Sequence, residues 1–194
     1  MAEDPQLIFN IHLQEYAQLK QEQRQRIGLR DNLLYFTLGV YVAILGFAVG
    51  EQGDPYALLV LPWVSLILGW TYLVNDQKIT AIGRYIRGQL TTKICKAVDA
   101  NTDIESVLTW EIAHRSDAHR KRRKVEQLIV DLVAFVLSGV AALVAFRYFY
   151  ITQLASDTEL IVNGAVRALW WVELILLLGL GFEILQHVDW LRGR

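Results

Sequence analysis

The chain has 194 residues, the size of one domain, and 54% of them are hydrophobic, with a mean hydropathy of +0.29. This apolar content is concentrated in blocks and is high for a soluble globular domain, so buried helices of a soluble protein are the less favoured explanation of the apolar runs. The formal net charge of -1 identifies no class of partner.

The N-terminal region predicts one long helix. Pro5 suits the first turn of a helix. Apolar side chains then recur every three to four residues, the spacing of one helical face: Phe9, Leu13, Tyr16 and Leu19. We expect a cytoplasmic helix over 6–30, and only Gly28 separates it from the uncharged segment 33–50. A bilayer core needs roughly 20 apolar residues in a helix, so 33–50 predicts the first span.

The second predicted span, 56–74, is also uncharged and is expected to continue as a cytoplasmic helix over 76–98. An apolar stripe runs along this extension: Ile79, Ile82, Ile86 and Leu90. Residues 99–101 indicate a turn, and 102–105 match a capping box, in which two side chains bind exposed backbone amides. A further cytoplasmic helix is therefore expected over 102–127.

The third and fourth predicted spans, 128–150 and 168–185, contain charged residues. Such groups are costly at membrane depth and normally face a partner helix or a wet cavity. They are Asp131, Arg147, Glu173 and Glu183. Arg147 and Glu173 lie at similar depth, so we predict an ion pair between them. Asp131 and Glu183 share a level near the inner ends, where they either line a wet cavity that attracts cations or are solvated among the headgroups.

Basic residues are distributed unevenly along the chain. If the N-terminus is inside, all but two of the 19 Lys and Arg residues lie inside, and the exceptions, Arg147 and Arg167, lie at the outer rim. This is the positive-inside bias. The sequence therefore predicts a multi-pass protein of the bacterial inner membrane with both termini in the cytoplasm. The expected fold is all-α, a four-transmembrane-helix bundle with long cytoplasmic helical extensions, in one integral membrane domain over 1–194.

A basic run directly precedes the third span: Arg120, Lys121, Arg122, Arg123 and Lys124. The run enforces topology, and it is also able to bind anionic lipid headgroups, at about 1 kcal/mol per basic residue near the surface. Membrane lipids are thus expected partners. No aromatic platform accompanies these charges, so no nucleic-acid partner is expected.

Small residues in two spans allow helices to approach closely. Gly46 and Gly50 form a GxxxG pattern in the first span. The third span offers a similar surface at Ser138, Gly139 and Ala142. Both patterns serve packing, either within one chain or between copies in a homo-oligomer, which is the expected assembly.

Motifs for catalysis are weak. Residues 111–114 form one ExxH motif, where a di-iron helical bundle needs two. Glu183 and His187 are only a pair, and 115–119 has one residue too few for the arginine-x4-6-histidine pattern of HEPN ribonucleases. No P-loop, GxSxG or dinucleotide fingerprint occurs. We expect no enzyme, no cofactor and no metal, with a metal-dependent site at the cytoplasmic face as the less favoured alternative.

Residues 75–87 read NDQKITAIGRYIR. This segment resembles an NDxxIxxIGxYIR-like segment of small four-span, cyanobacterial-type uncharacterised membrane proteins, and the resemblance covers most of the chain. Asn75 and Asp76 are expected to mark the exit from the membrane, and Gly83 to let another helix pass close to the isoleucine stripe. The layout is also broadly similar to SLATT-type and CRISPR-associated membrane effectors, a likeness of fold alone.

These features leave three classes of function. The favoured one is a non-enzymatic inner-membrane effector or channel-like component of a bacterial anti-phage defence or signalling system, built from several copies. The alternative is a membrane anchor or scaffold that recruits a cytoplasmic partner protein. An enzyme that uses the inner carboxylates or the histidines is the least favoured.

Overall fold

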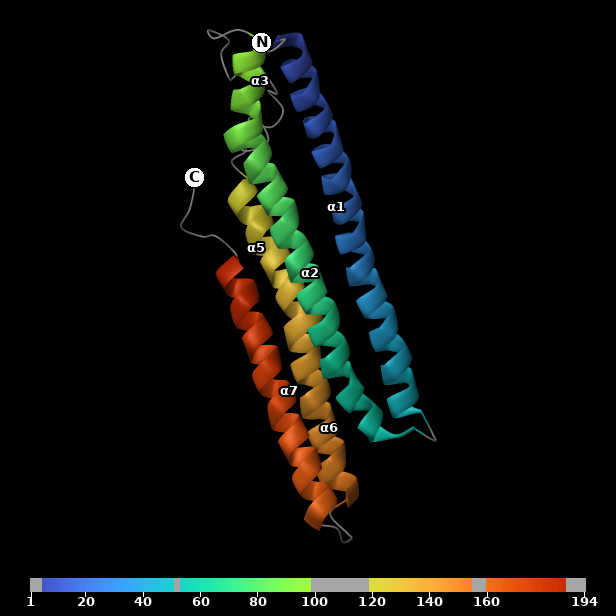
Figure 1. Cartoon of the computed structure of the whole chain (residues 1–194). Helices are drawn as coiled ribbons and strands as arrows, with labels where there is room; N and C mark the ends of the chain where they lie inside the picture. Colours follow the sequence, from blue (N-terminus) through green and yellow to red (C-terminus); the bar gives the residue numbers. More distant parts are fainter. Residues whose placement is uncertain (1–4, 51–52, 99–118, 155–159, 188–194) are drawn as a thin grey trace. The chain divides into compact units, whose positions relative to one another are not determined.

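The computed structural model describes residues 5–50, 53–98, 119–154 and 160–187. These residues are helical apart from short connections, and within them there is no β-strand (Figure 1). The all-α fold predicted from the sequence is therefore confirmed for the described part of the chain.

The first helix, α1, runs without a break over Pro5–Val49. The predicted helix 6–30 and the predicted span 33–50 are thus parts of one helix. Gly28 does not end it, because a single glycine inside a helix costs only about 1 kcal/mol relative to alanine.

The second hydrophobic segment begins with a short 3-10 helix, η1 (Pro55–Leu59). The carboxylate of Asp54 caps its start and accepts a hydrogen bond from the backbone amide of Tyr56 at 2.9 Å. The chain continues as α2 (Val60–Tyr85), the π-helical segment η2 (Ile86–Leu90) and α3 (Thr91–Val98). The predicted continuation of the second span over 76–98 is confirmed, whereas the π-helical segment has no counterpart in the sequence prediction.

The third helix consists of α5 (Arg120–Asp131), the π-helical segment η4 (Leu132–Leu137) and α6 (Ser138–Leu154), and α7 (Leu160–His187) follows. They include the predicted spans 128–150 and 168–185. The predicted turn at 99–101 and the capping box at 102–105 lie outside the described residues, as does most of the predicted helix 102–127.

Four helical stretches of the described residues are long and apolar enough to cross a membrane: Pro5–Val49, Pro55–Val98, Arg122–Phe149 and Gly164–His187. Their length and composition are those of a multi-pass membrane protein. The stretches differ in how much of them the chain itself covers. In the most apolar window of Pro5–Val49 only 17% is buried, against 44% in Pro55–Val98.

The chain divides into two compact units. Unit 1 comprises 1–31 and 74–123, and unit 2 comprises 32–73 and 124–194. Helices α1 and α2 each contribute to both units. Unit 2 therefore contains essentially all of the four predicted spans.

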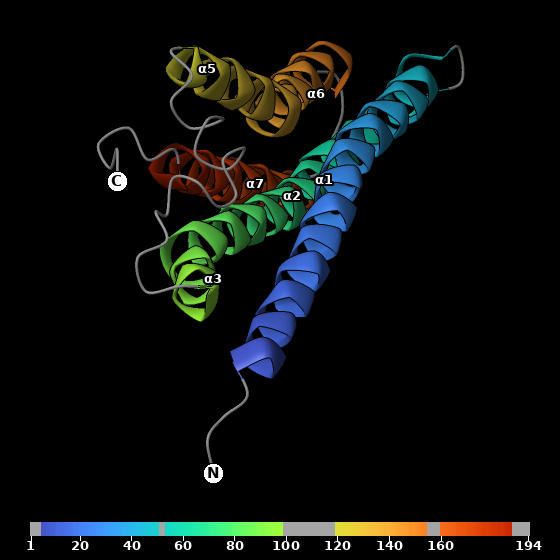
Figure 2. The same ribbon diagram turned by 90° about the horizontal axis from the view of Figure 1, so that it is seen from above.

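Unit 2 has an apolar core between its helices. Helix α6 packs against η1 and α7, and α7 also packs against η4. Figure 2 shows the helices from above. The fully buried members of this core are Leu58, Leu61, Phe135, Leu143, Leu177 and Leu180. Two buried glycines bring helices close together. A Cβ atom at Gly69 would lie 2.8 Å from Leu180 Cδ2, and one at Gly139 would lie 2.9 Å from Leu177 Cδ1.

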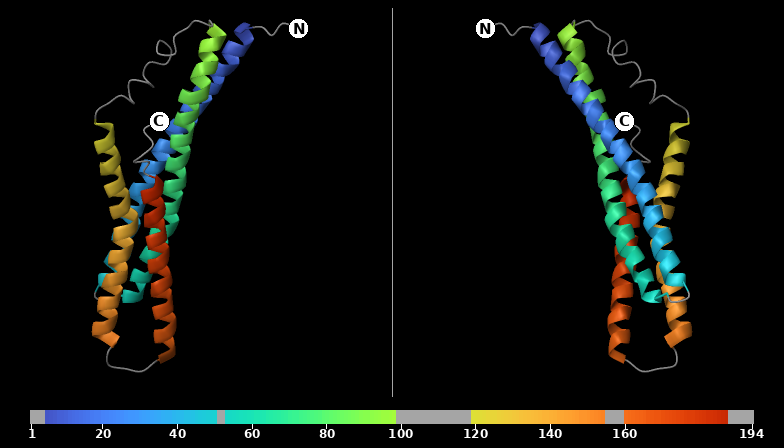
Figure 3. Two further views of the ribbon diagram at one scale, coloured as in Figure 1. Left: turned by 90° about the vertical axis from the view of Figure 1, so that its left-hand side faces the viewer. Right: turned by 90° about the vertical axis from the view of Figure 1, so that its right-hand side faces the viewer.

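Unit 1 pairs the N-terminal part of α1 with the end of α2, η2 and α3, and these stretches run side by side (Figure 3). The buried centre of the pair consists of Ile86, Leu90 and Ile94. Partly buried side chains surround it: Phe9, Tyr16, Leu19, Ile82 and Tyr85. The two apolar faces predicted from sequence periodicity thus pack against each other in part: Leu13 is exposed, and Ile79 is not a member of this cluster.

Candidate functional site

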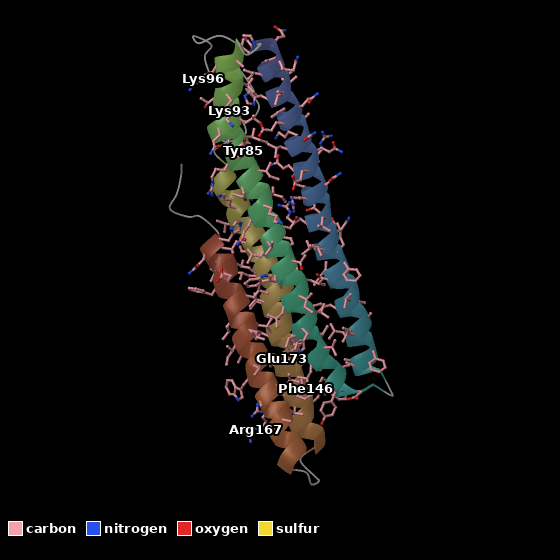
Figure 4. All side chains as sticks on the ribbon, in the orientation of Figure 1. Tyr85, Lys93, Lys96, Phe146, Arg167 and Glu173 are labelled. Atoms are coloured by element: carbon pink, nitrogen blue, oxygen red, sulfur yellow. The ribbon has the colours of Figure 1, made fainter. Side chains whose placement is uncertain are left out.

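Glu173 lies on α7 and is labelled in Figure 4. Its side chain is fully buried. Neither of its carboxylate oxygens has a hydrogen-bond partner in the described part of the chain. Arg147 on α6 is exposed. The predicted ion pair between Arg147 and Glu173 is therefore wrong, because similar depth does not make two side chains point toward each other.

The inner carboxylates have different surroundings. Asp131 is half-buried and accepts a hydrogen bond from Gln127 Nε2 at 2.8 Å. The same nitrogen donates to the hydroxyl of Tyr72 at 2.5 Å. Asp131 thus belongs to a polar group with Gln127 and Tyr72. Glu183 is half-buried on α7. That it lies at the same level as Asp131 stays a prediction.

A cluster of three hydroxyls lies in the core of unit 2. The hydroxyl of Tyr41 is hydrogen-bonded to Ser65 Oγ and, at 3.1 Å, to Ser138 Oγ. These groups come from α1, α2 and α6. Sequence reasoning missed this hydroxyl cluster, although each member is a polar residue inside an apolar run, which is the signal that points to it.

The π-helical segment η4 ends at the hydroxyl cluster. The backbone amide of Ser138 reaches back to the carbonyl of Val133, five residues earlier. Ser138 Oγ also donates to the carbonyl of Ala134 at 2.6 Å. In an α-helix the carbonyl of Ala134 would accept the Ser138 amide, but in this π-helical turn that amide bonds Val133 instead. The Ser138 hydroxyl therefore supplies the hydrogen bond that the Ala134 carbonyl would lack. Single π-helical turns often occur at functional sites.

The predicted packing glycines have different surroundings. A Cβ atom at Gly139 would meet Leu177 and, at 3.2 Å, Ser65 Oγ, so Gly139 serves packing within the chain. At Gly46 a Cβ atom would meet nothing within 4 Å, and at Gly50 it would meet only backbone atoms of its own helix. The GxxxG face of α1 is therefore exposed on unit 2.

In unit 1 the residues of the segment 75–87 contact α1. The side-chain amide of Asn75, which is 4% exposed, donates to the backbone carbonyl of Arg26 at 2.6 Å. Asp76 pairs with Arg30 at 3.2 Å. Gln23 Nε2 donates to the carbonyl of Ile79 at 3.5 Å. The segment thus provides polar contacts as well as the apolar stripe that hold α1 in unit 1.

Two further residues of the segment face α1. A Cβ atom at Gly83 would lie 3.2 Å from Arg87 Nη1 of the same helical stretch and 3.5 Å from Gln23 Nε2 at the tip of an α1 side chain, so the close approach of another helix at this glycine stays a prediction. Tyr85, labelled in Figure 4, donates a hydrogen bond to Glu15 Oε1 at 2.6 Å. This bond is the main reason why the pKa of Glu15 is lowered, and the His12 and Lys93 side chains lower it further, although burial acts in the opposite direction.

The predicted headgroup-binding run lies at the start of α5. Arg122, Arg123 and Lys124 are exposed. The side chains of Arg120 and Lys121 lie outside the described residues. The three exposed members keep the position, next to an apolar helix, that the lipid prediction requires.

For metal chemistry, the described residues contain no group of three or more His, Cys, Asp and Glu side chains that could hold an ion. The ExxH motif at 111–114 lies outside the described residues, and so does most of the near-miss motif at 115–119. Glu183 and His187 both lie on α7.

Comparisons of the chain with models of protein families, with curated proteins and with solved structures find no match. The likeness of segment 75–87 to small four-span membrane proteins therefore stays a resemblance. The geometry itself supplies two candidate sites in unit 2: the unpartnered carboxyl of Glu173, and the exposed small-residue face of α1.

Proposed function

We propose that this protein is a non-enzymatic component of the bacterial inner membrane, with both termini in the cytoplasm, that assembles from several copies. In this proposal the assembly is an effector or channel-like part of a defence or signalling system. The observation that carries it is the uncovered small-residue face of α1, which offers a second copy a close approach.

This face is opposite the buried face of α1. Because a helix turns about 100° per residue, side chains three and four apart share a face. The buried residues are Thr37, Tyr41 and Ala48. On the other side lie four exposed small residues: Gly39, Ala43, Gly46 and Gly50. In lipid, where apolar burial does not drive helix association, such faces favour close helix–helix packing.

The first test is the mass of the particle in lipid nanodiscs or mild detergent. One chain has a mass of 22.2 kDa, so the proposal requires a protein mass of several such chains. Gly46→Leu, which adds a bulky side chain to the small face, is expected to reduce the mass to that of one chain. The matched control is Gly179→Leu on α7, where a Cβ atom also meets nothing within 4 Å. A strictly monomeric wild type rejects the assembly.

The second test is the membrane potential of producing cells, followed with a voltage-sensitive dye. Induction of the wild type is expected to depolarise the membrane or arrest growth, with the products of neighbouring genes present where they are needed. Gly46→Leu is expected to lose this effect, and Gly179→Leu to keep it. An oligomer that leaves both potential and growth intact rejects the effector function but not the assembly.

The second candidate function is an anchor or scaffold for a cytoplasmic protein. It is favoured by a groove of about 550 Å³ on the part of α1 in unit 1. The groove is lined by Tyr16, Ala17, Lys20, Gln23, Arg24 and Ile27. The scaffold would be supported if the wild type retains one defined cytoplasmic protein on purification while the membrane potential stays intact. The Ala17→Arg variant should no longer retain that protein. Stoichiometric iron or zinc in the purified protein would instead support the metal-dependent enzyme.

A further inference from the structure

The carboxyl of Glu173 lies in an apolar interior. The residue is 0% exposed, and Leu177 and Leu180, which follow on the same face of α7, are 0% and 1% exposed. Both carboxylate oxygens lack a hydrogen-bond partner among the described residues. A buried polar group without a partner is costly, and a buried unpaired charge is far more so. The folded state must therefore supply something that removes the charge.

The helices of unit 2 bring no fixed charge to this carboxyl. Residues 32–50 of α1, 55–75 of η1 and α2, and 132–146 of η4 and α6 contain no Asp, Glu, Lys, Arg or His. The cations nearest along the chain, Arg147 and Arg167, are both exposed. The other titratable groups of these stretches are phenols: Tyr35, Tyr41, Tyr56 and Tyr72. Of these, Tyr41 is engaged by Ser65 and Ser138.

Two kinds of ligand can neutralise a buried carboxylate: a metal cation or a proton. A hard cation needs several oxygen ligands, about six to eight for calcium. The described residues contain no group of three or more His, Cys, Asp and Glu side chains that could hold an ion. A proton needs neither further ligands nor space in the tightly packed core. The surroundings of Glu173 therefore favour a proton.

We propose that Glu173 is a proton-binding residue of the membrane-spanning unit, neutral in the folded protein, and that release of its proton loosens the packing of α7 against its neighbours. Leu177, one helical turn further along α7, fits against Gly139 of α6, where a Cβ atom would lie 2.9 Å from Leu177 Cδ1. A charge created at Glu173 attracts water into this contact. Proton release would therefore act on α7 and α6 together. A monomer could carry this site equally well, so it does not depend on the assembly proposed above.

The direct test is infrared difference spectroscopy of the full-length protein in lipid nanodiscs at neutral pH. The wild-type spectrum is expected to contain the C=O stretch of a protonated carboxylic acid, shifted in D₂O, which disappears in Glu173→Gln. The matched control is Glu183→Gln, which removes a half-buried carboxyl from the same helix and is expected to retain the band. If Glu173→Gln instead removes only a carboxylate band, the proposal is overturned.

A second measurement, thermal unfolding at several pH values, tests whether proton release loosens the packing. It also keeps the proposal testable if Glu173→Gln folds poorly. Glutamine mimics the neutral acid, so Glu173→Gln must fold as well as the wild type near neutral pH, and failure to fold there contradicts the proposal. As pH rises above the pKa of an unfolded glutamate, about 4.3, the unfolded chain releases a proton that the folded protein still holds, so wild-type stability is expected to fall until the folded protein releases it too. Glu173→Gln lacks this loss. Thermal unfolding curves that run in parallel for the two proteins at all pH values would overturn the proposal.

Discussion

Gly139 illustrates how one missing side chain sets a helix–helix contact. A Cβ atom there would lie 2.9 and 3.0 Å from the two methyl carbons of Leu177 and 3.2 Å from Ser65 Oγ. Leu177 is fully buried and Ser65 is bonded to Tyr41, so neither side chain can easily move away. At Gly46 the space is open. The same residue type is thus a packing requirement at one position and an exposed surface at the other.

We expect Gly139→Ala to destabilise the protein by about 1–3 kcal/mol, the usual cost of overpacking a filled interior. Gly46→Ala, the matched control, is expected to leave stability unchanged or to raise it slightly, since alanine favours the helix. Thermal unfolding in detergent, followed by circular dichroism, measures both. Equal stability of the two variants would show that α6 and α7 do not approach as closely at Gly139 as the structure indicates.

Glu15 and Tyr85 give a prediction that depends on pH. The hydrogen bond from Tyr85 lowers the pKa of Glu15 in the folded state. The stabilisation linked to this shift is fully present above the unfolded-state pKa and is lost as pH falls through the lower folded-state pKa. The stability difference between wild type and Tyr85→Phe should therefore be largest near neutral pH and shrink in acid. Unfolding curves at several pH values measure it.

The control for this prediction is the same tyrosine substitution in a Glu15→Gln background. Without the carboxylate, the effect of Tyr85→Phe should no longer change with pH. If the effect of Tyr85→Phe in the wild-type background is constant from neutral to acidic pH, the hydrogen bond contributes nothing through the ionisation of Glu15.

At the residue scale, the sequence predicted where charges occur along the spans but not which way they face. The depth of Arg147 and Glu173 follows from counting residues. Their rotation about the helix axes depends on how α6 and α7 pack, and this is set by contacts such as that of Gly139 with Leu177. Gly69 was missed for the same reason, since its need for space appears only once Phe135 and Leu180 surround it.

At the element scale, apolar periodicity predicted the helices well. Long apolar runs bounded by polar residues leave the backbone little alternative to a helix in a bilayer, so the four spans and their continuations could be foreseen. The π-helical segments η2 and η4 could not. Each ends where a hydroxyl residue, Thr91 or Ser138, bonds a carbonyl of the preceding turn. Many apolar helices contain such residues without a π-helical turn, so sequence alone does not distinguish them.

Asn75 carries the element-scale prediction. It is nearly fully buried, and its amide donates to a backbone carbonyl of α1 in unit 1. Asn75→Ala removes this hydrogen bond, and a typical intramolecular hydrogen bond contributes about 0.5–1.5 kcal/mol to stability. We expect faster hydrogen–deuterium exchange over residues 5–31, because α1 is held less firmly there. The matched control is Gln77→Ala, an exposed amide two residues away. Equal exchange in both variants would contradict a role for Asn75 in holding α1.

At the scale of the whole molecule, the number of spans and the location of the basic residues make a joint prediction. Four crossings return the chain to its starting side, and the positive-inside bias assigns that side to the cytoplasm. Cys95, the single cysteine, is buried. A Cys95→Ser background therefore permits single engineered cysteines to report which side of the membrane each position faces.

Four exposed positions serve this purpose: Gln14, Asp54, Gly164 and Gln186. In intact spheroplasts, a membrane-impermeant maleimide is expected to label Asp54→Cys and Gly164→Cys. Gln14→Cys and Gln186→Cys should react only after the membrane is opened, because the basic segments next to α1 and α7 stay on the cytoplasmic side. Labelling of all four in intact cells would reject the spans altogether. Labelling of Gln186→Cys together with Gly164→Cys would show that α7 lies on one side of the membrane, leaving three crossings and separating the two termini.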